Sequence, residues 1–509
     1  MAVLGIDLGT SSVKISLADQ NGQLIQSSKR EYSLDQPQEG YKEIDPDRWI
    51  EAIQDCLFQD FTKSQRNTIQ AIGVTGQMHT LIVLGEQGRP LRKALMWNDL
   101  RAKDQADRLK TLLDQKEAAR KPGKNPSGIT SILSAGSPAA ALLWMKENES
   151  DLYRKITKIL IAPDYVVYRL TGQAVSDYCD MSTSSLLDYN SAKPSINMLE
   201  ILDLDLSVLP EITGIEQQAW PITKEAADYF DLPENCLVLT ATGDNSASAL
   251  GLNLFEERKP ILSIGTSGVI MACRDHPDFD HPGKNILFSL DGKTMLTMVQ
   301  GSLASGGSAL NWWVQNILNA DFDRVLNQAD PDHLDTGSLI FCPYLNGDKY
   351  VYPNSGLQGI FYGLTARTDA LQMALAVIEG VAFGLRTLAR EMDIDLKVYE
   401  SIEVTGGGSR SDVWMQMLAN VLQVPLKAGK SASSAAEGVM QSALRVLHKE
   451  RKDRIDGCAQ SETSSQRIEH SKEPAEKIYQ PACLPELEKK YQRFLNLMEM
   501  SVVFNQNNE

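Results

Sequence analysis

Short apolar runs alternate with amphipathic stretches along most of this chain. The runs at 72–74, 81–84, 236–242 and 402–405 are rich in Ile, Leu and Val and end in turns that contain Gly or Asp. Runs of this length between turn residues predict strands, and the amphipathic stretch that follows the last of them, about 412–422, predicts a helix. Strands that alternate with helices are typical of an α/β protein.

The pattern changes twice near the C-terminus. Residues 449–475 are polar and lack periodicity, which predicts a flexible connection. Residues 486–498 then return to helical spacing, with one apolar face made of Leu487, Tyr491, Phe494, Leu495 and Met498. Such a face predicts either packing back across the domains or a homodimer contact, and both interpretations stay open.

One segment near the N-terminus occurs again in the second half of the chain. Residues 3–14 read VLGIDLGTSSVK and residues 261–270 read ILSIGTSGVI, so that Gly9-Thr10-Ser11 aligns with Gly265-Thr266-Ser267. Each copy predicts a hairpin with a tip of small residues. Such a tip can approach a phosphate closely, because glycine has no Cβ and hydroxyls donate hydrogen bonds. The pair of hairpins predicts a nucleotide held between two related domains.

The two copies differ at one informative position, where the first has Asp7 and the second has Ser263. A carboxylate inside an apolar run is costly to bury unless a cation or strong donors meet it. Mg²⁺ beside nucleotide phosphates would meet it, directly or through water. Asp7 is therefore a candidate magnesium ligand, and the alternative is an ordinary Asp that flanks the turn.

A second carboxylate follows a predicted strand at Gly243-Asp244-Asn245 and stands at the start of a helix. Open α/β sheets bind ligands at the carboxyl ends of their strands. A helix N-terminus favours the ionised form of an acid, which leaves Asp244 able to accept a proton. The alternative, an Asp that only caps the helix, is the commoner role for a residue at this place.

Small residues gather at two further places in the second half. Residues 405–412 read TGGGSRSD between a predicted strand and a predicted helix, and Ser305-Gly306-Gly307-Ser308 precedes Asn311. The G-x-G-x-x-G spacing of a dinucleotide site is absent from the first of them. Together with the second hairpin, these segments predict a pocket for the phosphates and the adenosine of a nucleotide.

A polar turn, Thr75-Gly76-Gln77-Met78-His79-Thr80, separates two apolar runs, and Trp97-Asn98-Asp99 lies further along. An aromatic face beside amide and carboxylate groups suits a polyhydroxyl ligand. The alternatives are a structural histidine at His79 and a core tryptophan at Trp97.

Length and composition restrict the class of protein. The 509 residues exceed one ordinary core and predict two domains, 1–254 and 255–509. A net charge of −16 without a basic block argues against nucleic acids and anionic membranes as partners. Seven cysteines without a C-x-x-C pair predict reduced thiols rather than a zinc site. With no visible signal peptide, and with 139–145 as the longest apolar stretch, we expect a cytoplasmic protein.

With these motifs assembled, the chain resembles the FGGY family of carbohydrate kinases over residues 3 to about 446. The resemblance rests on motifs in the right order, namely 5–14 (GIDLGTSSVK), 243–245 (GDN), 263–268 (SIGTSG), 359–379 (GIFYGLTARTDALQMALAVIE) and 404–411 (VTGGGSRS). It implies the two-domain α/β fold shared with actin, hexokinase and heat-shock chaperone ATPases, in which duplicated RNase H-like domains enclose the active site. Gly76-Gln77-Met78-His79 with Trp97-Asn98-Asp99 is similar to the xylulokinases of that family.

The resemblance also implies roles for single residues. Asp244 matches the catalytic base and Asp7 the acid that positions Mg²⁺ and ATP. The sugar-binding positions would be Gln77, Met78, His79, Trp97, Asn98, Asp99 and Asn245. The nucleotide-binding positions would be Thr10, Ser11, Lys14, Gly265, Thr266, Gly307, Asn311, Gly407, Gly408 and Ser411.

These roles predict transfer of the γ-phosphoryl group of ATP to a ketopentose, with D-xylulose as the first choice. Three departures from the family pattern leave another ketose or polyol, such as ribulose, ribitol, gluconate or glycerol, as the alternative: Thr80, Ala141 and the segment 343–354. An actin-like or chaperone-like ATPase driven by a partner is a further alternative, which the turn around His79 disfavours.

Overall fold

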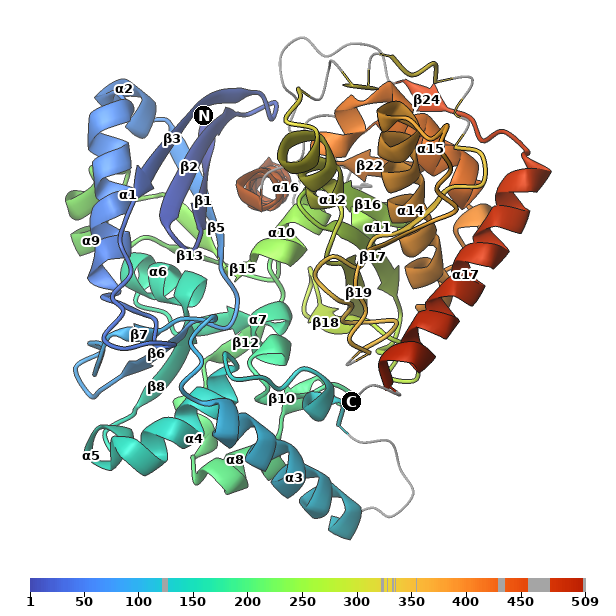
Figure 1. Ribbon diagram of the computed structural model, residues 1–509. Coiled ribbons are helices and arrows are strands. Elements are labelled where there is room, and N and C mark those ends of the chain that lie inside the picture. Colours follow the sequence, from blue (N-terminus) through green and yellow to red (C-terminus); the bar gives the residue numbers. More distant parts are fainter. Residues whose placement is uncertain are drawn as a thin grey trace.

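The computed structural model describes residues 1–120, 127–321, 325–326, 328–331, 334, 336–353, 355–428, 435–455 and 477–506. Figure 1 shows two lobes side by side, one built mainly from the N-terminal half of the chain and the other mainly from the C-terminal half. Each lobe has a seven-stranded sheet, in agreement with the expected two-domain α/β fold.

The first sheet has β1 (Ala2–Leu8) near its centre. This strand pairs antiparallel with β2 (Ser12–Asp19) and parallel with β5 (Ile69–Gly76). Both neighbours and both faces of β1 are covered, which explains its nearly continuous apolar sequence. The order of the sheet is β13-β14-β5-β1-β2-β3, and β15 (Thr242–Gly243) pairs with the end of β5.

The second sheet repeats this local arrangement. Its strand β16 (Ile261–Ile264) pairs antiparallel with β17 (Gly268–Arg274) and parallel with β22 (Ile402–Thr405). The order is β18-β19-β17-β16-β22-β23-β24. The predicted duplication is therefore present as two hairpins, each placed beside a parallel strand of its own sheet.

The elements between residues 24 and 257 include a smaller four-stranded sheet of order β4-β7-β6-β8 and complete the first lobe, except that the last of them, at 254–257, contacts β17 of the second sheet. They are β3 (Leu24–Glu31), β4 (Glu43–Ile44), α1 (Asp47–Asp60), α2 (Lys63–Arg66), β6 (Leu81–Leu84), β7 (Ala94–Leu95), α3 (Lys103–Arg120), α4 (Pro138–Asn148), α5 (Ser150–Tyr153), β8 (Lys158–Ile161), α6 (Ala162–Thr171), β9 (Val175–Asp177), α7 (Tyr178–Thr183), β10 (Leu187–Asp188), β11 (Lys193–Pro194), α8 (Ile196–Leu202), β12 (Glu211–Thr213), β13 (Ala219–Pro221), α9 (Lys224–Phe230), β14 (Leu237–Leu239), α10 (Asp244–Gly251) and α11 (Leu254–Glu257).

The second half of the chain supplies the remaining elements, most of which belong to the second lobe. They are β18 (Lys284–Phe288), β19 (Leu296–Leu303), α12 (Gly307–Asn311), a π-helical turn (Trp312–Ile317), β20 (Ile340–Cys342), β21 (Ile360–Tyr362), α14 (Ala370–Glu391), α15 (Asp412–Leu422), β23 (Leu426–Ala428), α16 (Ala435–Ile455), β24 (Ile478–Tyr479) and α17 (Pro485–Gln506).

Helix α16 joins the two lobes, and Figure 1 shows it end-on between them. It comes from the C-terminal half but packs on β1 and β5 of the first sheet. A Cβ on Gly5 would lie 2.5 Å from the carbonyl oxygen of Ala436, and one on Gly73 would lie 2.5 Å from that of Val439. The two glycines therefore let a helix backbone lie directly on the sheet.

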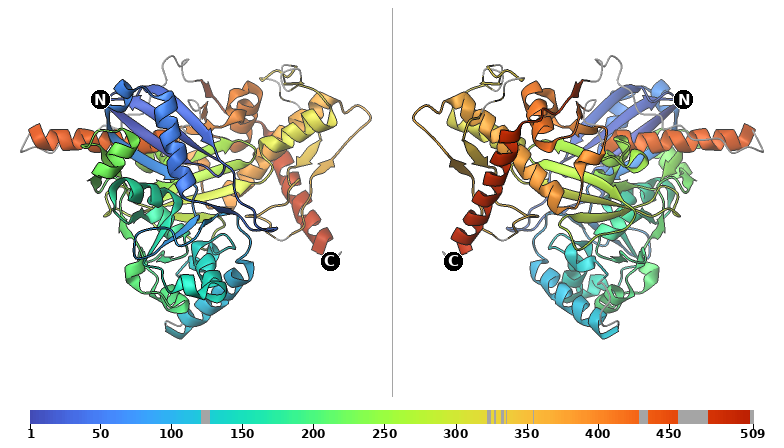
Figure 2. Two further views of the ribbon diagram at one scale, coloured as in Figure 1. Left: turned by 90° about the vertical axis from the view of Figure 1, so that its left-hand side faces the viewer. Right: turned by 90° about the vertical axis from the view of Figure 1, so that its right-hand side faces the viewer.

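Two predictions about the C-terminal region need correction. Helix α16 continues to Ile455, so residues 449–455 are helical where a flexible connection was expected, and 456–475 lie outside the described residues. Helix α17 is longer than the predicted 486–498 and follows the outer edge of the second lobe (Figure 2).

The apolar face of α17 packs on α14 and β20 of its own lobe, and not across the two domains as one interpretation expected. Tyr491 and Phe494 both contact Phe383 of α14, at ring-centroid distances of 5.5 and 5.4 Å. The Lys490 ammonium pairs with Glu379 of the same helix at 2.6 Å, with both side chains buried. The homodimer stays a prediction.

Helix α14 is long and apolar enough, by length and composition, to cross a membrane, and no other helix of the described ranges is. It is also the central helix of the second lobe, with 78% of its most apolar window buried. A Cβ on Gly380 would lie 2.2 Å from the carbonyl oxygen of Phe341, which shows how closely β20 is packed on it. Its hydropathy is that of a core helix.

Candidate active site

The second hairpin tip forms one wall of a cavity of about 740 Å³. The N–H of Gly307, at the start of α12, donates to the carbonyl of Gly265 at 2.7 Å, so the small-residue segment is tied to the tip. The glycine cluster after β22 also lines this cavity, beside the end of β16. Six of the predicted nucleotide-binding residues line this cavity: Gly265, Thr266, Gly307, Gly407, Gly408 and Ser411.

The same cavity has an apolar side, which suits a flat aromatic base next to a phosphate-binding tip. Leu310, Leu326, Val413 and Trp414 line it. Ser411 is the N-cap of α15, since its Oγ accepts from the N–H of Trp414 at 3.3 Å. Asn311 lies in α12, one turn after Gly307, and is not among the lining residues.

The first hairpin belongs to the other lobe and carries three predicted nucleotide residues, Thr10, Ser11 and Lys14. Lys14 stands directly opposite Asp7 in the β1–β2 ladder. The Thr10 hydroxyl accepts a hydrogen bond from the indole N–H of Trp97 at 3.0 Å. The tip of the first hairpin is thus in contact with a predicted sugar-binding residue.

Asp244 is the first residue of α10, and Gly243 is its N-cap. Its Oδ1 accepts from the N–H of Asn245 at 2.8 Å. Burial raises the pKa of this carboxyl to about 6, because the charged form loses hydration. Asp244 is therefore mostly ionised at neutral pH and close enough to its pKa to exchange a proton.

Asp7 lies one residue before the end of β1, where β5 places Thr75 beside it. The pKa of Asp7 is also raised to about 6, first by burial and then by repulsion from Asp244, while Lys14 lowers it. The two carboxylates therefore act on each other electrostatically. The predicted base and the predicted magnesium ligand come from sequence positions far apart and lie near the same edge of the first sheet, because β5 pairs with both β1 and β15.

The polar turn after β5 fits closely against the start of α10. A Cβ on Gly243 would lie 2.5 Å from the Cγ of Met78 and 3.0 Å from the sulfur of Cys179. Met78 is buried, and His79 adopts a left-handed backbone with φ of 67°. The glycine before Asp244 is required because the Met78 side chain occupies the space of its Cβ.

Several buried polar atoms near this turn have no hydrogen-bond partner within the described part of the chain. They are both amide atoms of Gln77, Nδ1 of His79, Oδ1 of Asn98 and Oγ1 of Thr75. Buried polar groups are nearly always hydrogen-bonded, so a cluster of unpartnered ones indicates a place where a polar ligand or water completes the site.

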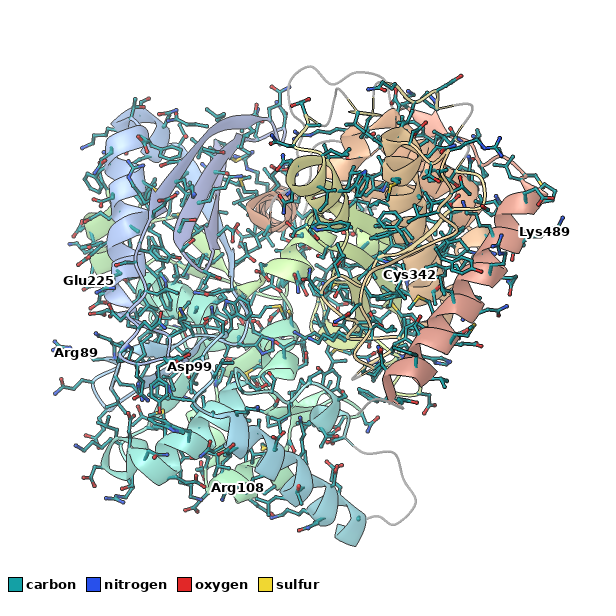
Figure 3. The ribbon with its side chains drawn as sticks, viewed as in Figure 1. Arg89, Asp99, Arg108, Glu225, Cys342 and Lys489 are labelled. Carbon is teal, nitrogen blue, oxygen red and sulfur yellow. The ribbon has the colours of Figure 1, made fainter. Side chains whose placement is uncertain are left out.

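Two residues of the predicted sugar site differ in their surroundings. The Trp97 side chain is 45% exposed, so its face is open to a ligand. Asp99 lies inside the first lobe (Figure 3) and accepts from the Arg101 guanidinium at 2.8 Å and from the N–H of Lys42 at 2.6 Å. Its carboxylate holds the loop that carries Trp97, and these bonds explain Asp99 without a sugar.

Sequence reasoning missed Lys284, at the start of β18. Its Nζ lies 2.9 Å from Nε2 of His79, although the two residues belong to different lobes. Burial and the Lys284 charge hold the pKa of His79 well below its usual value. No motif surrounds Lys284 in the sequence, so no local signal could have found it.

Comparison with known proteins agrees with this geometry. Residues 2–251 match the N-terminal domain, and residues 261–446 the C-terminal domain, of the model for the FGGY family of carbohydrate kinases. A xylulose kinase of Lactococcus lactis is 30% identical over 428 residues, which cover 82% of each chain.

Two solved structures are similar to this chain, and their names specify different acceptors. The ligand-bound xylulose kinase of Lactobacillus acidophilus has a TM-score of 0.78 and 27% identity, with 97% of this chain and 96% of that chain covered. The gluconate kinase of the same organism has a TM-score of 0.79 and 27% identity, with 99% and 98% covered. The fold, the duplicated hairpins and these matches agree: the chain belongs to the FGGY family of carbohydrate kinases.

Proposed function

We propose that this kinase transfers the γ-phosphoryl group of ATP to the primary hydroxyl of D-xylulose, giving D-xylulose 5-phosphate and ADP. The observation that supports it most is that Asp7 and Asp244, both with a raised pKa, repel each other at one edge of the first sheet, beside a cluster of unpartnered polar groups. The xylulose kinases among its relatives support the choice of sugar.

Asp244 is the general base of the proposed reaction. As the acceptor oxygen forms its bond to the γ-phosphorus, the bond from that phosphorus to the bridging oxygen of ADP breaks, and the hydroxyl proton passes to Asp244. Such a loose transition state leaves the protein mainly the tasks of positioning and charge stabilisation. A carboxylate with a pKa of about 6 suits this role near neutral pH.

Asp7 would hold Mg²⁺, directly or through water. The described residues offer no ready-made cluster of three or more metal ligands, so most of the coordination would come from phosphate oxygens and water. The fit rests on a dehydrated carboxylate next to a second one, a pair that a divalent cation would stabilise. When bound, the ion would neutralise charge on the phosphate oxygens.

In this proposal the nucleotide lies in the cavity of the second lobe. Its phosphates extend from Thr266 and Gly307 toward Thr10, Ser11 and Lys14 of the first hairpin. The sugar lies against Met78, His79, Asn245 and the exposed face of Trp97, with Gln77 and Asn98 supplying the unpartnered polar atoms. Asp99 acts through the loop it holds.

A second candidate acceptor is an aldonate such as gluconate. Thr80 is buried and its hydroxyl accepts from the N–H of Trp97 at 3.3 Å, so the departure from the family pattern at this position touches the sugar-binding loop. A gluconate kinase is as similar in sequence as a xylulose kinase is. Membership of a carbohydrate kinase family removes the alternative of a partner-driven ATPase.

The proposal also places the enzyme in the cytoplasm, where ATP is available. The six cysteines of the described chain are all free thiols, which suits a reducing compartment.

The test is ADP release with Mg-ATP and a panel of D-xylulose, L-xylulose, D-ribulose, L-ribulose, ribitol, gluconate and glycerol. We expect D-xylulose to give the highest kcat/KM. We expect Asp244→Ala to lower the rate by a factor of about 10²–10⁴. A higher kcat/KM for gluconate would overturn the choice of sugar but keep the mechanism. A loss below about tenfold in folded Asp244→Ala would contradict the role of the base.

A further inference from the structure

We propose that Lys284 is a positioning residue of the sugar site, delivered by the second lobe to fix the orientation and the tautomer of His79. This inference rests on the proposed sugar-binding role of His79. It concerns how that histidine is held rather than which sugar it contacts.

Strand β18 brings Lys284 to the first lobe because the strand is anchored there. The N–H of Leu287 donates to the Ser182 hydroxyl of α7 at 3.2 Å, and the Tyr189 hydroxyl donates to the carbonyl of Asn285 at 2.9 Å. Both bonds join the two lobes within three residues of Lys284. The base of the Lys284 side chain is therefore fixed relative to the turn that carries His79.

The same junction continues beyond the end of β18. The N–H groups of Ile215 and Glu216 donate to the carbonyls of Ser289 and Leu290, at 3.2 and 2.8 Å. A Cβ on Gly214 would lie 2.3 Å from the backbone nitrogen of Gly292, so the two backbones touch. Lys284 thus stands on a bonded interface between the lobes and not on a free loop.

The contact with His79 has a definite chemical meaning. An ammonium group has three donors and no acceptor, so Nε2 of His79 must offer its lone pair at 2.9 Å. The ring proton is then on Nδ1, a buried atom that has no hydrogen-bond partner within the described residues. Lys284 therefore selects a neutral imidazole of one tautomer in the left-handed turn after Met78.

The surroundings of Lys284 indicate a functional rather than a stabilising role. Within the described ranges no carboxylate oxygen lies within ion-pair distance of its Nζ, and its only hydrogen bond goes to an uncharged ring. Holding a partly buried ammonium without a paired carboxylate costs stability. Asp244 and Asp180 attract the charge at longer range, while Lys349 repels it. The cost is understandable where the ammonium organises a binding site.

The experiment compares Lys284→Met, Lys284→Arg and Lys293→Met with the wild type. Lys293 is exposed in the turn that follows β18, so the same substitution there is the matched control. Each protein is assayed with whichever acceptor the panel identifies, so a wrong choice of sugar leaves the test intact. Acceptor binding without ATP is measured by calorimetry, using D-xylulose first, and ADP binding is measured in parallel.

We expect Lys284→Met to raise the KM and the Kd for the acceptor about tenfold or more, because a hydrogen bond to a charged group is lost. The KM for ATP and the Kd for ADP should stay within about twofold, and Lys284→Arg should recover part of the acceptor affinity. Nitrogen-15 spectra of the histidines should show the Nδ1–H tautomer of His79 in the wild type and a mixture in Lys284→Met.

Two results would overturn the inference. One is an unchanged acceptor KM in folded Lys284→Met, which would make the contact incidental. The other is a parallel loss of acceptor affinity, ADP affinity and thermal stability that Lys284→Arg does not recover, which would make Lys284 a structural residue of the junction.

Discussion

At the scale of single residues, ionisation of the two carboxylates of the site has opposite effects on the proposed activity and on folding stability. Asp7 and Asp244 each have a pKa of about 6 in the folded protein, against an ordinary value of 3.8. The folded state therefore binds protons more tightly than the unfolded chain does. The proposed mechanism needs the ionised forms for activity, whereas folding stability is greater with the protonated forms.

The proposed need for ionised carboxylates makes activity depend on pH. We expect kcat/KM for the acceptor to rise with pH around a midpoint near 6 and to level off about one unit higher, as the carboxylates ionise. A profile from pH 4.5 to 8 measures this. Because the two carboxylates interact, the acidic side of the profile reports the titration of the pair and not of either residue alone. Full activity at pH 5 would contradict the raised pKa values.

The pH dependence of stability has the opposite sign. A raised folded pKa stabilises the protein below the unfolded pKa, near 4, and this contribution is lost as pH rises through about 6. At pH 7.5, Asp244→Asn should therefore have a free energy of unfolding about 1–3 kcal/mol higher than the wild type, and a higher melting temperature. Thermal unfolding at pH 7.5 and 4.5 tests it, and the gain should shrink at the lower pH.

Two adjacent glycines, Gly407 and Gly408, line the cavity proposed for the nucleotide and allow another test. A Cβ on Gly407 meets nothing within 4 Å, whereas one on Gly408 would lie 2.4 Å from Cγ2 of Ile264. Gly407→Ala should keep its thermal stability and raise the KM for ATP, because the methyl group enters the space of the ligand. Gly408→Ala should instead lose about 1–3 kcal/mol of stability. An unchanged KM for ATP in Gly407→Ala would indicate that the nucleotide binds elsewhere.

At the scale of elements, the sequence predicted the strands and helices that carry chemistry better than it predicted how they pack. The strand expected at 402–405 is β22 and the helix expected at 412–422 is α15. The single strand expected at 236–242 is divided into β14 and β15, because only part of it pairs with β5. The strand that pairs with this segment lies far away in the chain, so the local pattern could not predict where the pairing is interrupted.

The packing of α16 on the first sheet gives a prediction at this scale. Gly73→Ala would place a Cβ 2.5 Å from the carbonyl oxygen of Val439, in contact with the helix backbone and not with a flexible side chain. We expect a loss of about 1–3 kcal/mol of stability. Gly407→Ala, which adds the same methyl group in open space, is the control. An unchanged melting temperature would show that α16 can move away from β5 at little cost.

At the scale of the whole molecule, one arginine connects α16 to both sides of the domain boundary. Arg445 pairs with Glu216 at 2.6 Å and with Glu256 at 3.4 Å, and all three side chains are largely buried. Arg445→Met would leave two buried carboxylates without their cation, so we expect a loss of about 3 kcal/mol or more. Arg390→Met, at an exposed pair with Glu391, should change little. Similar melting temperatures for the two variants would contradict the role of Arg445 in holding the lobes together.

The sequence by itself determined the fold class, the duplicated hairpins and the family, because these depend on local patterns that recur at fixed places in the chain. It also singled out Asp7, Asp244 and the glycines that line the cavity of the second lobe, because their residue types suit the proposed chemistry. Only the tertiary structure decided that Asp99 supports a loop, that α17 packs back on its own lobe and that Lys284 reaches His79. Each of these is a contact between segments distant in sequence, and such contacts are set by the packing of elements that no local pattern records.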